Sequence, residues 1–118
     1  MPEHFYCRVE LTQSQPLHLL LFPTHPIDPT GPFVVADPFA QFTAWLRSFN
    51  EISQIQPEQG ADWFQIRFYF QMQPFCLHYE HYSDCYWIDA DSQASLVLLS
   101  TLAEFIASFE YNHRLSQP

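Results

Sequence analysis

The sequence predicts an α+β domain: an antiparallel sheet of about five strands, in the order ββαβββα, with two helices packed on one face. Three observations predict this class. Several segments alternate apolar and polar residues with a period of two, as half-buried strands do. Two other segments repeat apolar residues every three or four positions, which is typical of amphipathic helices. Short turns separate the last three strands, which indicates an antiparallel meander.

The first strand is expected at residues 4–11, where alternation points Cys7 to one face and Tyr6 to the other. After a short turn, the leucine-rich segment 17–22 returns as the second strand. The next segment, 23–38, is rich in proline, which removes backbone donors and fixes φ. We therefore expect an extended connector there.

The first helix is expected to begin at Asp37, a good N-cap residue, because Pro38 fits the first helical turn. Its apolar stripe reads as core rather than as a cofactor site: Phe39, Phe42, Trp45, Leu46 and Phe49. Asp91 is the expected N-cap of the second helix, which carries a broad apolar stripe. Residues 111–118 are polar, so we expect a frayed tail there.

The segment 51–57 fits either a short edge strand or a loop, because Pro57 interrupts a largely polar run. Three strands follow, at 62–71, 74–82 and 85–90. No internal repeat is visible, and a chain of 118 residues suffices for one core. We expect residues 1–118 to form a single domain.

The charge balance excludes two classes of partner. Thirteen acidic residues stand against four arginines, with no lysine, and the net charge is −9. Binding to nucleic acid draws most of its affinity from cationic contacts, and anionic membranes attract basic segments. We therefore expect neither nucleic acid nor membrane as a partner.

The three cysteines predict a reducing environment. Cys7, Cys76 and Cys85 are odd in number and contain no Cys-x-x-Cys pair, and the start of the chain has no basic leader segment. We expect free thiols, a cytoplasmic location, and no metal or cofactor.

A polar row is expected on the sheet face that points away from the helices. Two-residue turns at Met72–Gln73 and Ser83–Asp84 would align residues of three neighbouring strands, whose Cβ atoms would then lie about 5 Å apart. The aligned residues would be Arg67, His78 and Asp89, with Glu80 beside them.

This row allows a catalytic hypothesis, a small hydrolase or lyase. His78 would act as a general base oriented by Asp89, and Arg67 would hold an anionic substrate. A zinc variant would use Cys76, His78 and Asp89 as ligands. No catalytic or zinc signature spacing supports either version, and an open sheet face excludes water poorly. Alternating charges are also what a solvated sheet ordinarily carries.

The hypothesis that we favour is a non-enzymatic interaction or adaptor domain. Its binding surface would be the same face, with these residues as contacts: Tyr6, Tyr69, Tyr82, Trp87 and Arg67. Aromatic residues and arginine are the usual anchors of protein interfaces. The partner would be another protein or a second copy of the chain, giving a two-fold symmetric dimer.

Two resemblances accompany this hypothesis. Gly60-Ala61-Asp62, Leu77 with Glu80, and Ser83 with Trp87-Ile88 form a pattern similar to that of a small bacterial family known only as a domain of unknown function. This resemblance covers residues 60–107 and implies no activity. In size and acidity the chain also resembles type III secretion chaperones, which are small cytoplasmic α+β proteins that dimerise. A cytoplasmic chaperone is therefore the alternative binding function.

Overall fold

The computed structural model describes residues 5–24, 35 and 37–115. It confirms the α+β class, with one antiparallel sheet and both long helices on the same face of that sheet. The elements are β1 Tyr6–Leu11, β2 Leu19–Thr24, α1 Pro38–Arg47, β3 Ile52–Gln59, β4 Trp63–Phe70, β5 Gln73–Glu80, β6 Cys85–Ala90, α2 Gln93–Val97 and α3 Leu99–Leu115.

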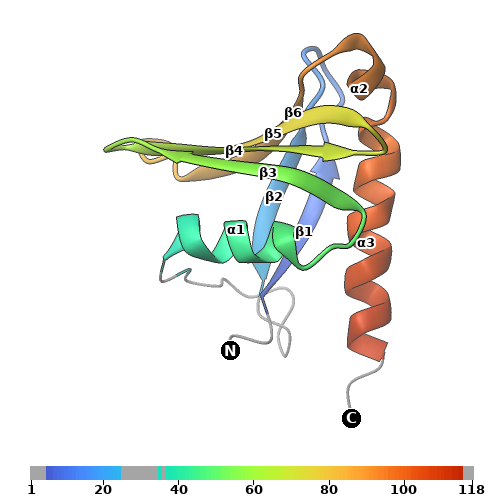
Figure 1. The fold of residues 1–118 in the computed structure, drawn as a ribbon, viewed down its shortest axis with the longest axis horizontal. Coiled ribbons are helices and arrows are strands. Elements are labelled where there is room, and N and C mark those ends of the chain that lie inside the picture. The colour runs from blue at the N-terminus through green and yellow to red at the C-terminus, as the bar shows by residue number, and fades with distance from the viewer. Residues whose placement is uncertain (1–4, 25–34, 36, 116–118) are drawn as a thin grey trace.

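The sheet has six strands in the order β1-β2-β6-β5-β4-β3, and every neighbouring pair is antiparallel. Strands β3 to β6 form a continuous meander. The hairpin of β1 and β2 joins that meander through β2, which lies beside β6 (Figure 1). Most of the expected connector, residues 25–34 and 36, lies outside the described residues, and its two ends belong to β2 and α1.

The strand beyond the expected five is β3, in the segment whose sequence fits either a short edge strand or a loop. Residues 52–59 pair with β4 as β3, at one edge of the sheet. The register shifts between Ser53 and Gln56, and Gln54 adopts a φ of 52°, so the strand contains a bulge. The bulge and Pro57 blunt this edge against pairing with another strand. The polar composition that obscured the strand follows from its exposed edge position.

The helix termini agree with the sequence only in part. Asp37 caps α1 as expected, and its Oδ1 accepts a hydrogen bond from the Ala40 amide at 3.3 Å. The second helix is divided, however, and its N-cap is Ser92 rather than Asp91, because the Ser92 hydroxyl accepts from the Ser95 amide. The chain bends at Leu98 and continues as α3 to Leu115, through part of the expected tail; residues 116–118 lie outside the described residues.

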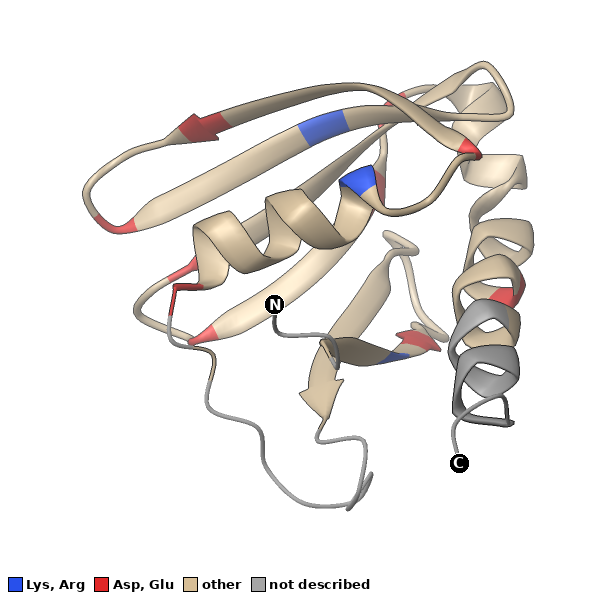
Figure 2. Ribbon diagram, turned by 60° about the horizontal axis from the view of Figure 1, so that its bottom comes forward, with Lys and Arg blue, Asp and Glu red and all other residues tan. Residues whose placement is uncertain are grey.

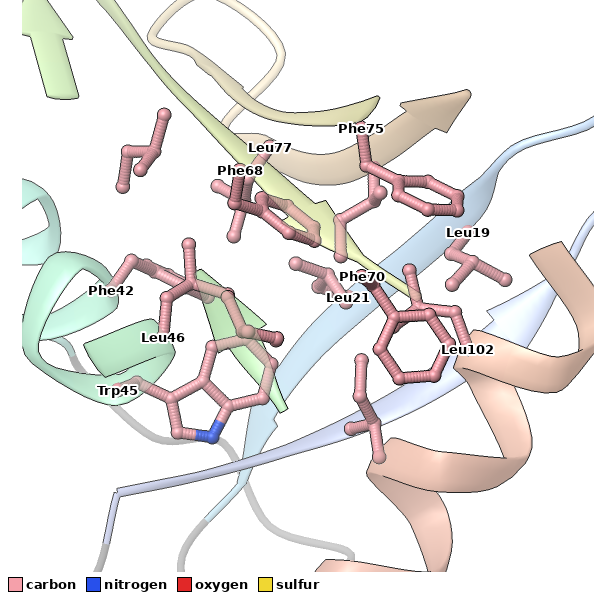
Figure 3. Packing of buried hydrophobic residues seen from close by; sticks show 14 of the residues in the cluster. Leu19, Leu21, Phe42, Trp45, Leu46, Phe68, Phe70, Phe75, Leu77 and Leu102 are labelled. Atoms are coloured by element: carbon pink, nitrogen blue, oxygen red, sulfur yellow. The ribbon is translucent and has the colours of Figure 1, made fainter. Parts of the chain in front are cut away.

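One aromatic and aliphatic core fills the space between the sheet and the two long helices (Figure 3). Phe42 and Leu46 of α1 are completely buried, as is Leu102 of α3. They pack against the residues of β4 that alternate with Arg67: Phe64, Ile66, Phe68 and Phe70. Leu77 of β5 and Ile88 of β6, which alternate with His78 and Asp89, are buried in the same core, so the outward face predicted for Arg67, His78 and Asp89 is confirmed.

The register of the meander is shifted by two residues from the one expected. The β4–β5 turn uses Gln71 and Met72, which both have positive φ, 51° and 65°, as in a type I′ turn. The β5–β6 turn spans residues 81–84, so that Glu80 pairs with Cys85. A shift of two keeps every side chain on its expected face but changes its cross-strand partner.

Candidate functional site

The candidate site is the sheet face that points away from α1 and α3, which we call the open face. A row of directly paired residues crosses it from β2 to β4: Leu20, Trp87, His78 and Gln65. The neighbouring row consists of Asp89, Cys76 and Arg67. The expected pairing of Arg67 with His78 is therefore wrong, because the shifted turn places Arg67 opposite Cys76.

His78 and Asp89 nevertheless meet, along a diagonal between β5 and β6. The His78 Nε2 atom lies 3.3 Å from Asp89 Oδ2. The Trp87 indole N–H donates to the same oxygen at 3.1 Å, and the Trp87 and His78 rings stack with centroids 5.2 Å apart. The Asp89 carboxylate thus holds two neighbouring rings in fixed orientations.

This arrangement shifts the pKa values of His78 and Asp89. The hydrogen bond to Asp89 is the main cause that raises the pKa of His78 to about 9, and a hydrogen bond with the Cys76 thiol adds to it, while burial opposes the shift. The hydrogen bond from His78 in turn lowers the pKa of Asp89. At neutral pH the two residues form an imidazolium–carboxylate pair on a partly exposed surface.

We expect a nuclear magnetic resonance titration of the His78 ring to give a pKa of about 9 in the wild type, and a value much closer to 6.5 in Asp89→Asn. The raised pKa means that the pair stabilises the fold fully below pH 6.5 and that this contribution is lost as pH rises towards 9. Equal His78 titrations in both proteins would contradict the pairing.

Cys76 faces this pair but is not accessible. Its exposed fraction is only 3%, because the longer side chains of Arg67 and Asp89 flank it across the strands and His78 flanks it along β5. The structure thus brings together the three residues of the zinc hypothesis. Within residues 5–24, 35 and 37–115, however, no group of three ligand-type side chains is arranged to hold a metal ion.

Arg67 and Glu80, the other members of the expected row, lie apart. Arg67 is exposed, and within the described part of the chain its guanidinium forms no ion pair or hydrogen bond. Glu80 lies between Trp63 and Cys85, and its carboxylate accepts a hydrogen bond from the Ser83 hydroxyl at 2.6 Å. Arg67 is therefore available to a partner, whereas Glu80 is engaged at the edge of the β5–β6 turn.

The expected aromatic contacts divide into three groups. Tyr69 and Trp87 lie partly exposed on the open face, Tyr69 two residues from Arg67 on β4 and Trp87 two strands away on β6. Tyr82 is 82% exposed but lies in the β5–β6 turn, beyond the end of the sheet. Tyr6 is only 4% exposed, so the assignment of this side chain to an accessible surface is wrong. The alternation along β1 predicts the side of the sheet on which Tyr6 lies. It does not reveal which other residues cover the Tyr6 side chain on that side.

Sequence reasoning missed the apolar part of the open face. Leu20 is paired with Trp87, and Phe22 lies under the Arg8 guanidinium, 4.3 Å from the ring centroid to Arg8 Cζ. The signal was present in the run "LHLLLF", because its last four residues are all apolar, so that both faces of the strand bear hydrophobic residues.

Gly60, the first residue of the Gly-Ala-Asp pattern, has a steric role. A Cβ atom at this position would lie 2.2 Å from Nε1 of Trp63, closer than any real contact allows. The Gly60 amide also donates to the Trp63 carbonyl at 2.9 Å. The glycine therefore lets the Trp63 indole lie against the β3–β4 connection.

Comparison with known families identifies one match. Residues 30–108 match a family described as "Protein of unknown function (DUF3630)". The match covers more than half of the chain and includes α1, the whole meander and α2, so the chain belongs to this family. No curated protein and no solved structure matches the chain. Among the described residues, no helix is long and apolar enough to cross a bilayer.

Proposed function

We propose that this member of the family is a non-enzymatic interaction domain, and that its open face binds a second copy of the chain. One observation carries the proposal. The open face presents the exposed Arg67 and the partly exposed Tyr69 and Trp87, and the two long helices pack on the other face of the sheet. Large aromatic side chains and arginine are the residues that most often anchor protein interfaces.

The charges of the open face favour a second copy. Its centre carries two positive groups, the Arg67 guanidinium and the His78 imidazolium, against the single Asp89 carboxylate. Carboxylates of Glu58 and Glu80 lie on the same face, away from the centre. In a two-fold arrangement, each surface meets its own copy, so the positive centre of one chain can face carboxylates of the other.

Opposing charges elsewhere limit how strong this association can be. Acidic residues lie mainly at strand ends and turns, and basic residues are few (Figure 2). Two chains with a net charge of −9 each repel one another at long range. At an ionic strength of about 0.15 M this repulsion is screened beyond about 8 Å, which leaves contacts within the interface to decide.

The edges of the sheet are less suitable than its open face for binding a second copy of the chain. At one edge, β3 is bulged and carries Pro57. At the other edge, α3 packs against β1. Addition of a partner strand to either edge is therefore disfavoured, and a face-to-face contact is the remaining mode.

Catalysis by His78 is the alternative that the geometry supports less well. A general base must be unprotonated, and a group with a pKa of about 9 is almost fully protonated at pH 7. The nearby thiol of Cys76 is buried at 3% exposure, and a substrate could not reach it without displacing its neighbours. These features suit a fixed, charged surface better than a reaction centre.

The free thiols support the expected cytoplasmic location. Cys76 and Cys85 form no disulfide with a described cysteine, as in proteins kept in a reducing compartment.

Charge reversal at Arg67 tests the proposal. Arg67→Glu should weaken self-association about 30-fold or more, the effect of losing an interface anchor worth about 2 kcal/mol. Arg47→Glu is the matched control, because Arg47 is exposed like Arg67 but lies on α1, on the opposite side of the sheet. Sedimentation equilibrium of the three proteins measures the dimer dissociation constant. Equal dissociation constants for wild type and Arg67→Glu would contradict the proposed interface.

A further inference from the structure

The sheet opens into a cleft where two of its strands separate. β2 pairs with β6 over only three residue pairs, which end at Leu21 and Tyr86. Beyond this point β2 continues beside β1 as far as Thr24, and β6 continues beside β5 as far as Cys85. The β1–β2 hairpin therefore diverges from the meander, as its downward course in Figure 1 shows.

The cleft between the diverging strands has a volume of about 540 Å³, which lies within the range of small-molecule sites. Its described walls are mostly apolar and come from β2, from Val35 and Pro38, and from the β5–β6 hairpin. The lining residues that the argument uses are Leu20, Phe22, Pro38, Tyr79, Asp84 and Tyr86.

Two tyrosines form the polar end of this cleft. The Tyr86 ring packs against the rings of Phe42 and Tyr79, with centroid distances of 4.7 and 4.8 Å. The Tyr86 hydroxyl forms no hydrogen bond to any described residue. Burial, followed by the negative charge of Asp84, raises the pKa of both tyrosines, so their hydroxyls stay protonated.

Among the described residues that line the cleft, Asp84 is the only charged one. It adopts a φ of 51°, a left-handed conformation that aspartate tolerates better than most residues. Its Oδ1 accepts a hydrogen bond from the Tyr79 hydroxyl at 3.3 Å, which leaves the rest of the carboxylate available. No lysine or arginine is among the lining residues that the structure describes, and the whole chain carries a net charge of −9.

We propose that this cleft binds a small organic amine, whose apolar body packs against Leu20 and Phe22 and whose ammonium group pairs with Asp84. The chemistry of the lining selects this class. An apolar wall favours a hydrophobic body, and an uncompensated carboxylate favours a cation. The negative field of the protein raises the local concentration of cations further. The ammonium end of the site rests on Asp84 and Tyr86, which do not belong to the open face, whereas the apolar wall shares Leu20 and Phe22 with it.

The test uses benzylamine as the probe and benzyl alcohol as its neutral counterpart. Isothermal titration with the full chain should give a dissociation constant for benzylamine of about 1 mM, as expected for so small a ligand. In Asp84→Asn, which keeps the shape and tolerates the same backbone conformation, this constant should rise about tenfold. Asp91→Asn is the control, since Asp91 is exposed and lies past the other end of β6.

The rate at which Cys85 is alkylated provides an independent measure of ligand binding in the same cleft. It lines the cleft and is exposed, whereas Cys7 and Cys76 are buried, so a thiol reagent should alkylate Cys85 first. Benzylamine at about 10 mM should fill about 90% of the sites in the wild type and in Asp91→Asn, and about half of them in Asp84→Asn, so it should slow the alkylation of Cys85 clearly less in Asp84→Asn. Equal benzylamine affinity in Asp84→Asn and the wild type, or alkylation of Cys85 unaffected by benzylamine, would overturn the proposal.

Discussion

Trp87→Asp is expected to produce a folded monomer. Trp87 lies on the open face, where its ring stacks on His78 and its indole N–H donates a hydrogen bond to Asp89. In the proposed dimer its remaining exposed surface becomes buried, and an aspartate there would place an additional carboxylate beside Asp89 inside the interface. A buried, unpaired charge at an interface costs several kcal/mol, so association should weaken by at least about 100-fold.

Light scattering and circular dichroism together give the result of this experiment. Val97→Asp is the matched control, because Val97 is 78% exposed and lies on α2, beyond the end of the sheet. That variant should associate like the wild type. Trp87→Asp should keep the circular dichroism spectrum of the wild type, because Trp87 is not part of the buried core between sheet and helices. A folded Trp87→Asp dimer would contradict the proposed interface.

Phe42→Ala is expected to cause the largest loss of stability among single substitutions in α1. Phe42 is completely buried, and its ring packs against Tyr86 and Phe5 at centroid distances of 4.7 and 5.0 Å. Removing such a ring leaves a cavity and costs about 3–5 kcal/mol. This is a large share of the roughly 5–15 kcal/mol that stabilises a typical domain.

Urea denaturation measures this loss, and Phe39→Ala provides a control of the same chemistry. Phe39 lies one turn earlier in α1 and is only partly buried, with its ring 5.3 Å from that of Phe64. Its replacement should cost about half as much or less, because less apolar surface returns to water. If both substitutions had the same cost, Phe42 would not have the central position in the core that the structure gives it.

The faces of the central strands could be predicted from the sequence, but their register could not. Strict alternation in β4 identifies Phe64 and Phe68 as core residues whichever turn follows. The register depends on which residues form the turn, and the turn at Gln71 and Met72 has positive φ without the glycine or asparagine that normally signals it. The face on which each side chain lies can thus be predicted from the alternation along the strand. The register depends on the turns, and these turns lack the residues by which such turns are normally recognised.

The candidate site was predictable to the same extent. His78 and Asp89 share a face on neighbouring strands, so they come within reach of each other in the predicted register and in the observed one. The access of solvent to Cys76 and Tyr6 was not predictable, since both have the parity of the open face and both are buried. The cleft beside β6 could not be foreseen either, because it arises where pairing between β2 and β6, strands far apart in the sequence, ends.

Sedimentation equilibrium of the wild-type chain tests the central claim most directly. The measurement should cover concentrations from about 1 µM to about 1 mM at an ionic strength of about 0.15 M, where long-range repulsion is screened. We expect the weight-average mass to rise from that of one 13.9 kDa chain to that of two, and to reach no higher value, because a two-fold interface closes on itself. A mass of one chain at every concentration would contradict the account.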